Sequence, residues 1–455
     1  MEKKITAILD RSIYPYLYCL GFLIYKTARY FPSFNILTAL ACLAVSWLFC
    51  WGLFLVTRLI LQFRYPAIAV LLILLSLLHV ATVAKALGYE YAYIPDGFYL
   101  IFYLLVLIVI IFMEYGLRRL PVLNFHANKV FNVFVLIECV VFLVHGIYFS
   151  PEAKGTPRRF NAAARHIPVG RQKDIVWILM DEYASSNSLR HQFAFENPLD
   201  RALRRDQFEL LPDIRTRFNA TLFSVNAIFN EDDTVSQSSF FSCIPSISQS
   251  IWVPQLEASG YRFVNLGVFD IGRYKKMADR SGYPQAYLQQ VLSGTILNVI
   301  NNKLTFNIQS CDQFVKDVVS RLEDSLHQPS EQPRFFWAHI SVPHEPFCRD
   351  SHGQLQQAAS YRESDSATIK RKYVEYLQYG NQLILHILAA HPELAEKIVV
   401  ISGDHGPRYP FLHDKAYQFW PYAAVHFPVR YDTVKLRRLG YISQLPSFIM
   451  HNLSD

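Results

Sequence analysis

Cysteine is scarce in this chain, with seven residues in 455. Four of them lie in strongly apolar stretches, namely Cys19, Cys42, Cys50 and Cys139. The other three, Cys243, Cys311 and Cys348, lack the close paired spacing of a zinc knuckle. A fold held by a disulfide framework is therefore excluded, and at most one disulfide is expected.

Charged residues are also few, at 18% of the chain, and neither an internal repeat nor a low-complexity tract is present. The formal net charge is nevertheless +7. Much of this basic excess lies in short loops between apolar segments, where Lys and Arg determine membrane topology. We therefore expect no nucleic-acid partner.

Long apolar runs dominate the first 150 residues. Four runs, starting near Phe34, Ala67, Gly97 and Val130, are each long enough to span a bilayer, which takes roughly 20 residues. A weaker segment from Ser12 to about Tyr25 fits a signal anchor, a short span or a re-entrant piece, and we count it as a fifth span. No small-residue cleavage site follows it, so we expect it to be retained. Residues 1–150 are thus predicted to form a membrane domain.

The distribution of basic residues predicts how these spans are oriented. With the N-terminus in the cytoplasm, eight basic residues fall inside and only three fall outside. The inside set is Lys3, Lys4, Arg11, Arg58, Arg64, Arg118, Arg119 and Lys129, and the outside set is Lys26, Arg29 and Lys85. The part of the chain after about residue 150 is then expected outside the cytoplasm.

After a polar linker at 151–172, residues 173–455 show the pattern of an α/β domain. Short apolar runs start at Asp174, Tyr261, Arg334 and Lys397, as expected of buried parallel strands. Helix-like stretches, such as 310–326 and 367–390, lie between them. This alternation predicts an α/β sandwich with a mostly parallel central sheet.

Three of the four predicted strands end in residues capable of chemistry. These are Asp181 with Glu182, His339 followed by His344, and Asp404 with His405. The carboxyl ends of parallel strands share one edge of a sheet, so these side chains are expected to converge. Carboxylates and imidazole suit Zn²⁺ or Mn²⁺, with Ca²⁺ or Mg²⁺ as alternatives. Each short motif alone also fits a solvated strand end or an ordinary turn.

Together, the motifs resemble the sulfatase-like branch of the alkaline phosphatase superfamily, in particular its membrane-bound phosphoethanolamine and phosphoglycerol transferases. The resemblance covers roughly residues 172–430. It rests on the apolar strand that ends in Asp181-Glu182, on the stretch from Val342 to Phe347, and on the Ser402-Gly-Asp-His-Gly406 motif. Five spans before an outer catalytic domain are also similar to the transferase members.

The resemblance implies a hydroxyl nucleophile some 40 residues after the first acid. Thr221 occupies that window and is similar to the unmodified Thr of the transferases, while Ser224 is the alternative nucleophile. The formylglycine pattern of sulfatases is absent from this window. A hydroxyl of this kind can form a phospho-Thr intermediate that a second acceptor resolves.

Carried over by position, the resemblance implies metal ligation by Asp181, Glu182, Asp404 and His405, with Thr221 at the open position. His344 is implied to contact substrate oxygens or act on the leaving group. Two further candidates for substrate contact are Arg408 and His413, whereas His339 is expected to be a packed core residue. Pro407-Arg408 departs from the phosphoethanolamine enzymes, which often have an acid there, so the head group is left open.

The expected function is metal-dependent transfer of a phospho-substituent from a membrane phospholipid to an envelope glycan or lipid. The implied location is a bacterial inner or cytoplasmic membrane. Two alternatives remain open, hydrolysis of a sulfate or phosphate ester and a non-catalytic membrane regulator.

Overall fold

The computed structural model describes most of the chain. The described residues are 12–29, 36–87, 96–119, 124–148, 172–231, 246–247, 250–277, 288, 291–292, 295–297, 308–356 and 365–454. The chain divides into two compact units, Met1–Pro157 with Pro284–Thr305, and Arg158–Tyr283 with Phe306–Asp455. The predicted linker at 151–172 lies outside the described residues apart from Gln172, and the boundary at residue 150 stays a prediction.

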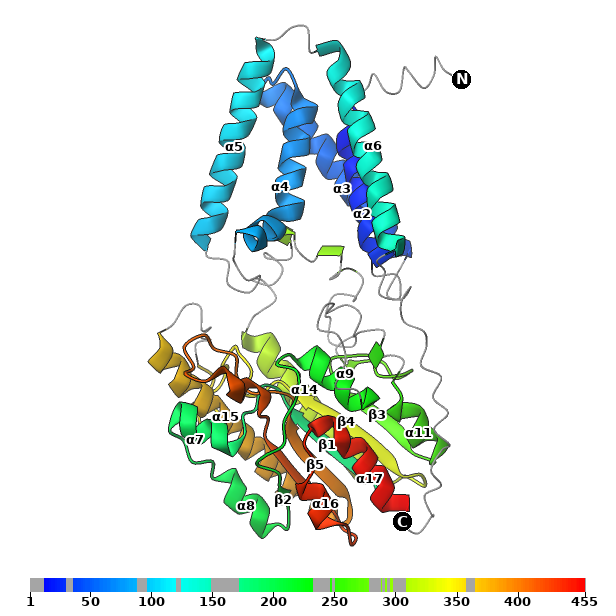
Figure 1. The fold of residues 1–455 in the computed structure, drawn as a ribbon, viewed down its shortest axis with the longest axis vertical. Coiled ribbons are helices and arrows are strands. Elements are labelled where there is room, and N and C mark those ends of the chain that lie inside the picture. The colour runs from blue at the N-terminus through cyan, green and yellow to red at the C-terminus, as the bar shows by residue number, and fades with distance from the viewer. Residues whose placement is uncertain are drawn as a thin grey trace. The chain divides into compact units, whose positions relative to one another are not determined.

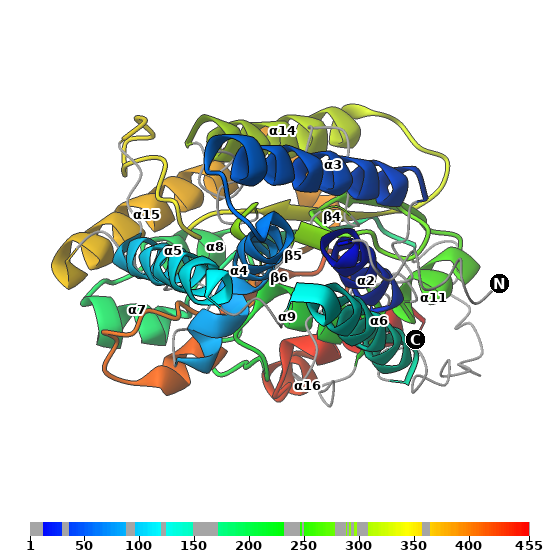
Figure 2. The same cartoon turned by 90° about the horizontal axis from the view of Figure 1, so that it is seen from above.

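The first unit is helical, as the apolar runs predict (Figure 1). Its helices are α2 (Tyr14–Arg29), α3 (Ile36–Leu55), the π-helical turn η2 (Val56–Ile60), α4 (Pro66–Ala86), α5 (Asp96–Arg118) and α6 (Asn124–Tyr148). Helices α2 and α6 lie side by side in both views (Figure 1 and Figure 2). Buried residues of α2, α3, α4 and α6, among them Tyr18, Cys50 and Val135, form one apolar cluster.

Large apolar side chains also cover the outside of this unit. Leu37 of α3 is 75% exposed and Phe112 of α5 is 73% exposed, and many neighbouring Leu, Ile and Val residues are similar. An exposed apolar surface of this extent indicates contact with a membrane or with another protein. Among the described residues, Ile36–Ile60 and Gly97–Gly116 are long and apolar enough to cross a bilayer. These features fit a membrane-embedded unit, while the number of spans and their orientation stay predictions.

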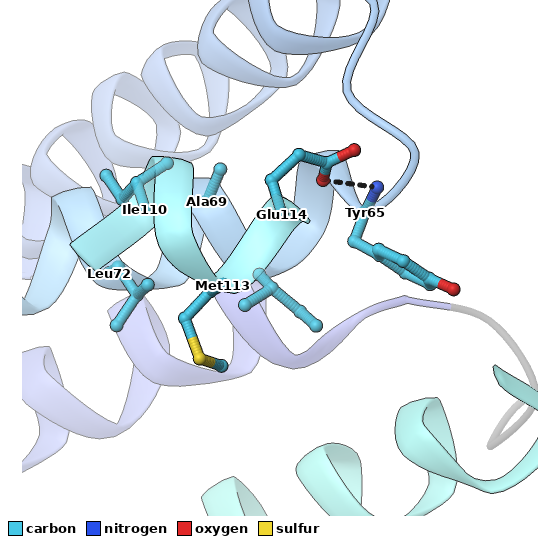
Figure 3. A pocket seen from close by; sticks show the side chains of 7 residues that line it. Tyr65, Ala69, Leu72, Ile110, Met113 and Glu114 are labelled. Atoms are coloured by element: carbon cyan, nitrogen blue, oxygen red, sulfur yellow. Dashed lines mark hydrogen bonds between the residues drawn. The ribbon is translucent and has the colours of Figure 1, made fainter. Parts of the chain in front are cut away.

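Glu114 of α5 connects that helix to the start of α4. Its carboxylate accepts the backbone N–H groups of Arg64 (2.6 Å) and Tyr65 (3.1 Å), just before α4 begins at Pro66. Figure 3 shows this contact beside a small pocket that Leu72, Ile110 and Met113 help to line. Backbone donors at the start of a helix lack helical partners, so the acid is explained by this capping role.

The second unit is built on a six-stranded sheet in the order β2-β6-β5-β1-β4-β3. The strands are β1 (Ile175–Met180), β2 (Glu209–Leu210), β3 (Arg262–Leu266), β4 (Arg334–Ile340), β5 (Ile398–Gly403) and β6 (Ala423–His426). Strands β3, β4, β1 and β5 are parallel, whereas β6 and β2 are antiparallel to their neighbours. The predicted α/β fold with a mostly parallel sheet is confirmed, and the antiparallel pairings of β6 with β5 and β2 were not predicted.

Helices pack on both faces of this sheet (Figure 1). The α-helices are α7 (Ser186–Phe193), α8 (Leu199–Arg205), α9 (Thr221–Asn230), α11 (Trp252–Ala258), α14 (Ile308–His327), α15 (Ser366–Ala390), α16 (Thr433–Arg437) and α17 (Leu445–Ser454), and the 3₁₀ turns are η8 (Pro392–Glu396), η9 (Lys415–Phe419) and η10 (Ile442–Gln444). Successive strand residues face opposite sides. Val176, Ile178 and Met180 of β1 accordingly pack with α14 and α15, while Trp177 faces α9 and α17.

Asp174 links the amino ends of three adjacent strands. Its carboxylate accepts the backbone N–H of Arg334 at 2.7 Å, pairs with the guanidinium of Arg334 at 2.8 Å and contacts Lys397 Nζ at 3.0 Å. Arg334 begins β4, and Lys397 precedes β5. The starting points of β1, β4 and β5 are therefore fixed by one carboxylate.

Replacing Asp174 by Ala should strongly destabilise the second unit. The change leaves the Arg334 guanidinium buried without its acid, and breaking a buried pair in this way costs about 3–5 kcal/mol. Thermal unfolding of the full chain in detergent, followed by tryptophan fluorescence, measures the effect. The control is Glu196→Ala, since its pair with Arg190 is exposed and its loss should leave the midpoint unchanged. Equal midpoints for the two variants would contradict the role of Asp174.

Candidate metal centre

The carboxyl ends of β1, β4 and β5 bring the predicted site residues together. Strand β1 lies between β5 and β4, with Met180 opposite both Gly403 and Ile340. Asp181 follows β1 and Asp404 follows β5 at the same edge of the sheet. The convergence inferred from the strand pattern is therefore present in the fold.

Three side chains form a cluster of potential metal ligands. One oxygen each of Asp181 and Asp404 and one ring nitrogen of His405 all lie within 4.8 Å of one another. His405 and Asp404 are fully buried. The Nδ1 atom of His405 lies 2.9 Å from the Gly406 carbonyl, which can only accept, so Nδ1 carries the proton. In the neutral ring Nε2 then presents its lone pair to the cluster, as a metal ligand must.

The two oxygens of Asp404 have different surroundings. Oδ1 accepts the backbone N–H groups of Glu182 and His405, both at 2.9 Å. Oδ2 is buried 3.3 Å from His405 Nε2 and has no hydrogen-bond partner in the described part of the chain. A buried carboxylate oxygen without a donor is costly. A divalent cation would satisfy it, so this residue set fits a metal.

Thr221 is the first residue of α9 and faces the cluster. Its Oγ1 donates a hydrogen bond to Asp181 Oδ1 at 3.2 Å and lies 3.5 Å from His405 Nε2. Ala220, not Thr221, is the N-cap residue, so the hydroxyl does not cap the helix. The N-terminus of a helix also favours an anionic phosphate. The hydroxyl is therefore placed among the potential ligands, next to a position suited to phosphate.

Ser224, the alternative nucleophile, lies elsewhere. Its side chain is fully buried, donates to the Phe218 carbonyl at 3.2 Å and lies 3.3 Å from the Thr216 hydroxyl. Thr221 therefore lies at the cluster, whereas the Ser224 side chain contacts the loop that leads into α9.

Glu182 does not join the cluster, although the sequence predicts it as a ligand. Its backbone has a positive φ of 62°, and its carboxylate accepts the Arg408 N–H at 3.2 Å and lies 3.6 Å from Arg408 Nε. Its main-chain N–H, rather than its carboxylate, contacts Asp404. Arg408 is 38% exposed and remains accessible to a bound anion.

Two histidines lie around Asp181. His339 was expected to be a packed core residue, and it is fully buried in β4, but its Nε2 also lies 3.4 Å from Asp181 Oδ2. Burial alone would lower the pKa of His344, but the carboxylates of Asp181 and Glu182 outweigh it and raise the pKa to about 9. Burial would raise the pKa of Asp181, yet the nearby His344, His339 and His405 hold the pKa of this carboxyl well below its usual range. His344 is therefore positively charged at neutral pH.

His413 is not brought to this site by any described contact. Its side chain is exposed, and its backbone N–H donates to Gln192 Oε1 at 3.1 Å. Its predicted role in substrate contact stays a prediction.

The contact between His339 and Asp181 is the feature that the sequence reasoning missed. Its signal was the position of His339 near the end of β4, beside the strand that carries Asp181.

No protein-family model matches this sequence, and no curated protein matches it. Among solved structures, the chain is similar to an integral membrane lipooligosaccharide phosphoethanolamine transferase A from Neisseria meningitidis. The identity is 13%, the match covers 97% of this chain and 94% of the other, and the TM-score is 0.45.

Two further structures match a smaller share of the chain. The periplasmic domain of a phosphoethanolamine transferase from Campylobacter jejuni has 15% identity, covers 61% of this chain and 87% of that one, and has a TM-score of 0.38. A putative sulfatase from Bacteroides fragilis has 10% identity, covers 62% and 74%, and has a TM-score of 0.40.

Proposed function

We propose that this chain is a metal-dependent transferase that moves a phospho-substituent from a membrane phospholipid to an envelope glycan or lipid through Thr221. One observation carries the proposal. The Thr221 hydroxyl lies 3.2 Å from Asp181 at the start of a helix, among three potential metal ligands. A nucleophile, a metal site and a phosphate-binding helix terminus coincide there.

The metal would be held by Asp181, Asp404 and His405, with the Thr221 hydroxyl at the remaining position. Two carboxylates and one imidazole favour Zn²⁺ or Mn²⁺ over Ca²⁺ or Mg²⁺, which prefer oxygen ligands alone. Bound there, the cation would lower the pKa of the hydroxyl and neutralise charge on a phosphoryl oxygen. In this proposal Glu182 does not bind the metal and instead contacts Arg408.

The chemistry proceeds in two displacements. Thr221 Oγ1 forms a bond to phosphorus while the bond from phosphorus to the diacylglycerol oxygen breaks, and the hydroxyl proton leaves along its hydrogen bond to Asp181 and passes to water. A hydroxyl of the acceptor then attacks phosphorus and breaks its bond to Thr221, whose oxygen regains a proton from water through Asp181. Protonated His344 gives its proton to the departing diacylglycerol oxygen and takes one from the acceptor hydroxyl in the second displacement.

The membrane-embedded unit supports a lipid donor, because tethering to the bilayer keeps such a donor at high effective concentration. We propose that the chain is embedded in a bacterial inner membrane. Its N-terminus would lie in the cytoplasm and its second unit outside the cytoplasm. The substituent is of the phosphoethanolamine or phosphoglycerol type.

Incubation with phospholipid labelled in its head group tests the proposal. Label on a glycan or lipid acceptor supports transfer, whereas label released only as a free phosphoester would show hydrolysis.

Replacing His344 by Gln should lower the turnover of phospholipid about 10²- to 10⁴-fold, because the leaving oxygen loses its proton donor. A donor whose leaving group is p-nitrophenolate needs no such proton, so its turnover should fall far less. Rates of diacylglycerol and nitrophenol release measure the two effects. The matched control is the exposed His352→Gln. An equal loss with both donors would contradict the acid role of His344.

A further inference from the structure

A short extended segment leads directly into the helix that carries Thr221. Its residues alternate in exposure, with Ile214, Thr216 and Phe218 buried and Arg215 and Arg217 exposed. This period of two places both arginines on the same side of the segment. The chain therefore presents two neighbouring guanidinium groups just before α9.

Hydrogen bonds to other parts of the chain hold this segment in place. The Arg215 N–H donates to the Gly440 carbonyl at 3.0 Å, and the Ile442 N–H donates to the Arg215 carbonyl at 2.9 Å. The Thr216 N–H donates to the Phe419 carbonyl at 2.9 Å. The segment is thus bonded on both sides, and the arginines extend from a fixed backbone.

Each guanidinium lies over an aromatic ring. Arg215 Cζ is 4.7 Å from the centre of the Trp420 ring, and Arg217 Cζ is 4.5 Å from that of Tyr441. Stacking restricts a long side chain while its N–H donors stay available at the edges. Within the described residues, neither arginine forms an ion pair, and nearby Asp213 is exposed and also unpaired. Both positive charges are therefore available to an anionic ligand.

The two arginines lie within reach of the nucleophile. Alternate residues of an extended chain are about 7 Å apart, and Arg217 precedes Thr221 by four positions, which limits their Cα separation to about 14 Å. The intervening Asn219 donates to Gln418 at 2.8 Å. Arg215 precedes Thr221 by six positions, so its own limit is about 21 Å, and an acceptor of oligosaccharide size could place a hydroxyl at Thr221 and anionic groups at both arginines.

We propose that Arg215 and Arg217 form an anion-binding subsite for the acceptor, which carries at least two phosphate, sulfate or carboxylate groups. Paired guanidinium groups with free donors suit such oxyanions. This inference rests on the proposed transfer through Thr221, because the acceptor is the second substrate of that reaction.

Binding of a polyanion to the full chain tests the subsite without any transfer. The protein is the Thr221→Ala variant in uncharged detergent, and the probe is sucrose octasulfate, with sucrose as the uncharged control. Adding Arg215→Gln and Arg217→Gln should raise the Kd at least about tenfold, as measured by calorimetry. The Kd of the parent should also rise with added salt. The matched control variant is Arg437→Gln, whose guanidinium already pairs with Glu209.

An unchanged Kd in the double arginine variant, or the same loss in Arg437→Gln, overturns the subsite. So does a loss of transfer in the double variant, with Thr221 restored, that appears only when anionic phosphatidylserine is added to nanodiscs that already contain the phospholipid donor, since that result assigns the arginines to the membrane surface. Equal melting temperatures establish that the double variant is folded. Failure of the proposed transfer chemistry would instead appear as the absence of phospho-Thr221 from the wild-type protein. The Thr221→Ala variant would still bind sucrose octasulfate.

Discussion

Replacement of Thr221 by Ala lowers group transfer at least about 10⁴-fold, because it removes the atom that is proposed to form the covalent bond to phosphorus. The fold should be preserved, since the side chain is only partly buried and does not cap α9. Release of diacylglycerol from labelled phospholipid measures the rate. Mass spectrometry of the wild-type protein should locate the intermediate on the peptide that contains Thr221.

Two variants act as controls for this result. Thr221→Ser keeps a hydroxyl and should retain part of the activity. Ser224→Ala removes a hydroxyl in the same helix that contacts Phe218 and Thr216 instead of the cluster, so transfer should persist. Full turnover by Thr221→Ala, or a covalent adduct on Ser224, would show that the nucleophile has been assigned wrongly.

Replacement of Asp404 by Asn should remove the metal and, with it, the activity. Asn keeps the shape of the side chain and can still accept the N–H groups of Glu182 and His405 through one oxygen. The buried Oδ2, however, becomes an NH₂ group that cannot bind a cation. We expect metal affinity and turnover to fall at least about 100-fold, since even residues that only support a ligand are worth 10- to 100-fold.

Elemental analysis of the purified full chain measures this loss, together with activity after chelation and addition of Zn²⁺ or Mn²⁺. Asp317→Asn, a change of a half-buried residue on α14 that does not belong to the cluster, is the control and should retain its metal. Stoichiometric metal of unaltered affinity in Asp404→Asn would contradict the proposed centre. Restoration of activity by one cation alone would identify it.

Much of the fold follows from patterns that are visible in the sequence. Continuous apolar runs mark the strands that carry Asp181 and Asp404, because a parallel strand is buried on both faces. The strands Glu209–Leu210 and Ala423–His426, at one side of the sheet, were not predicted. They are short, and their pairing depends on the neighbouring strand rather than on their own periodicity.

The candidate site was predicted in part. Asp181, Thr221, Asp404 and His405 are close together, as their order and residue types suggested. The direction of the Glu182 carboxylate could not be foreseen, because residues other than Gly rarely adopt a positive φ. The contact of His339 with Asp181 depends on strand register, which the sequence does not show.

The hydrogen bonds of Asp404 Oδ1 have a counterpart at the other edge of the sheet. Asp404 joins the carboxyl ends of β1 and β5 through the Glu182 and His405 N–H groups, and Asp174 joins their amino ends. The two strands that carry the potential ligands are thus anchored at both ends by protein atoms alone. A cation entering the proposed site would therefore have little chain left to order and could exchange without disturbing the fold.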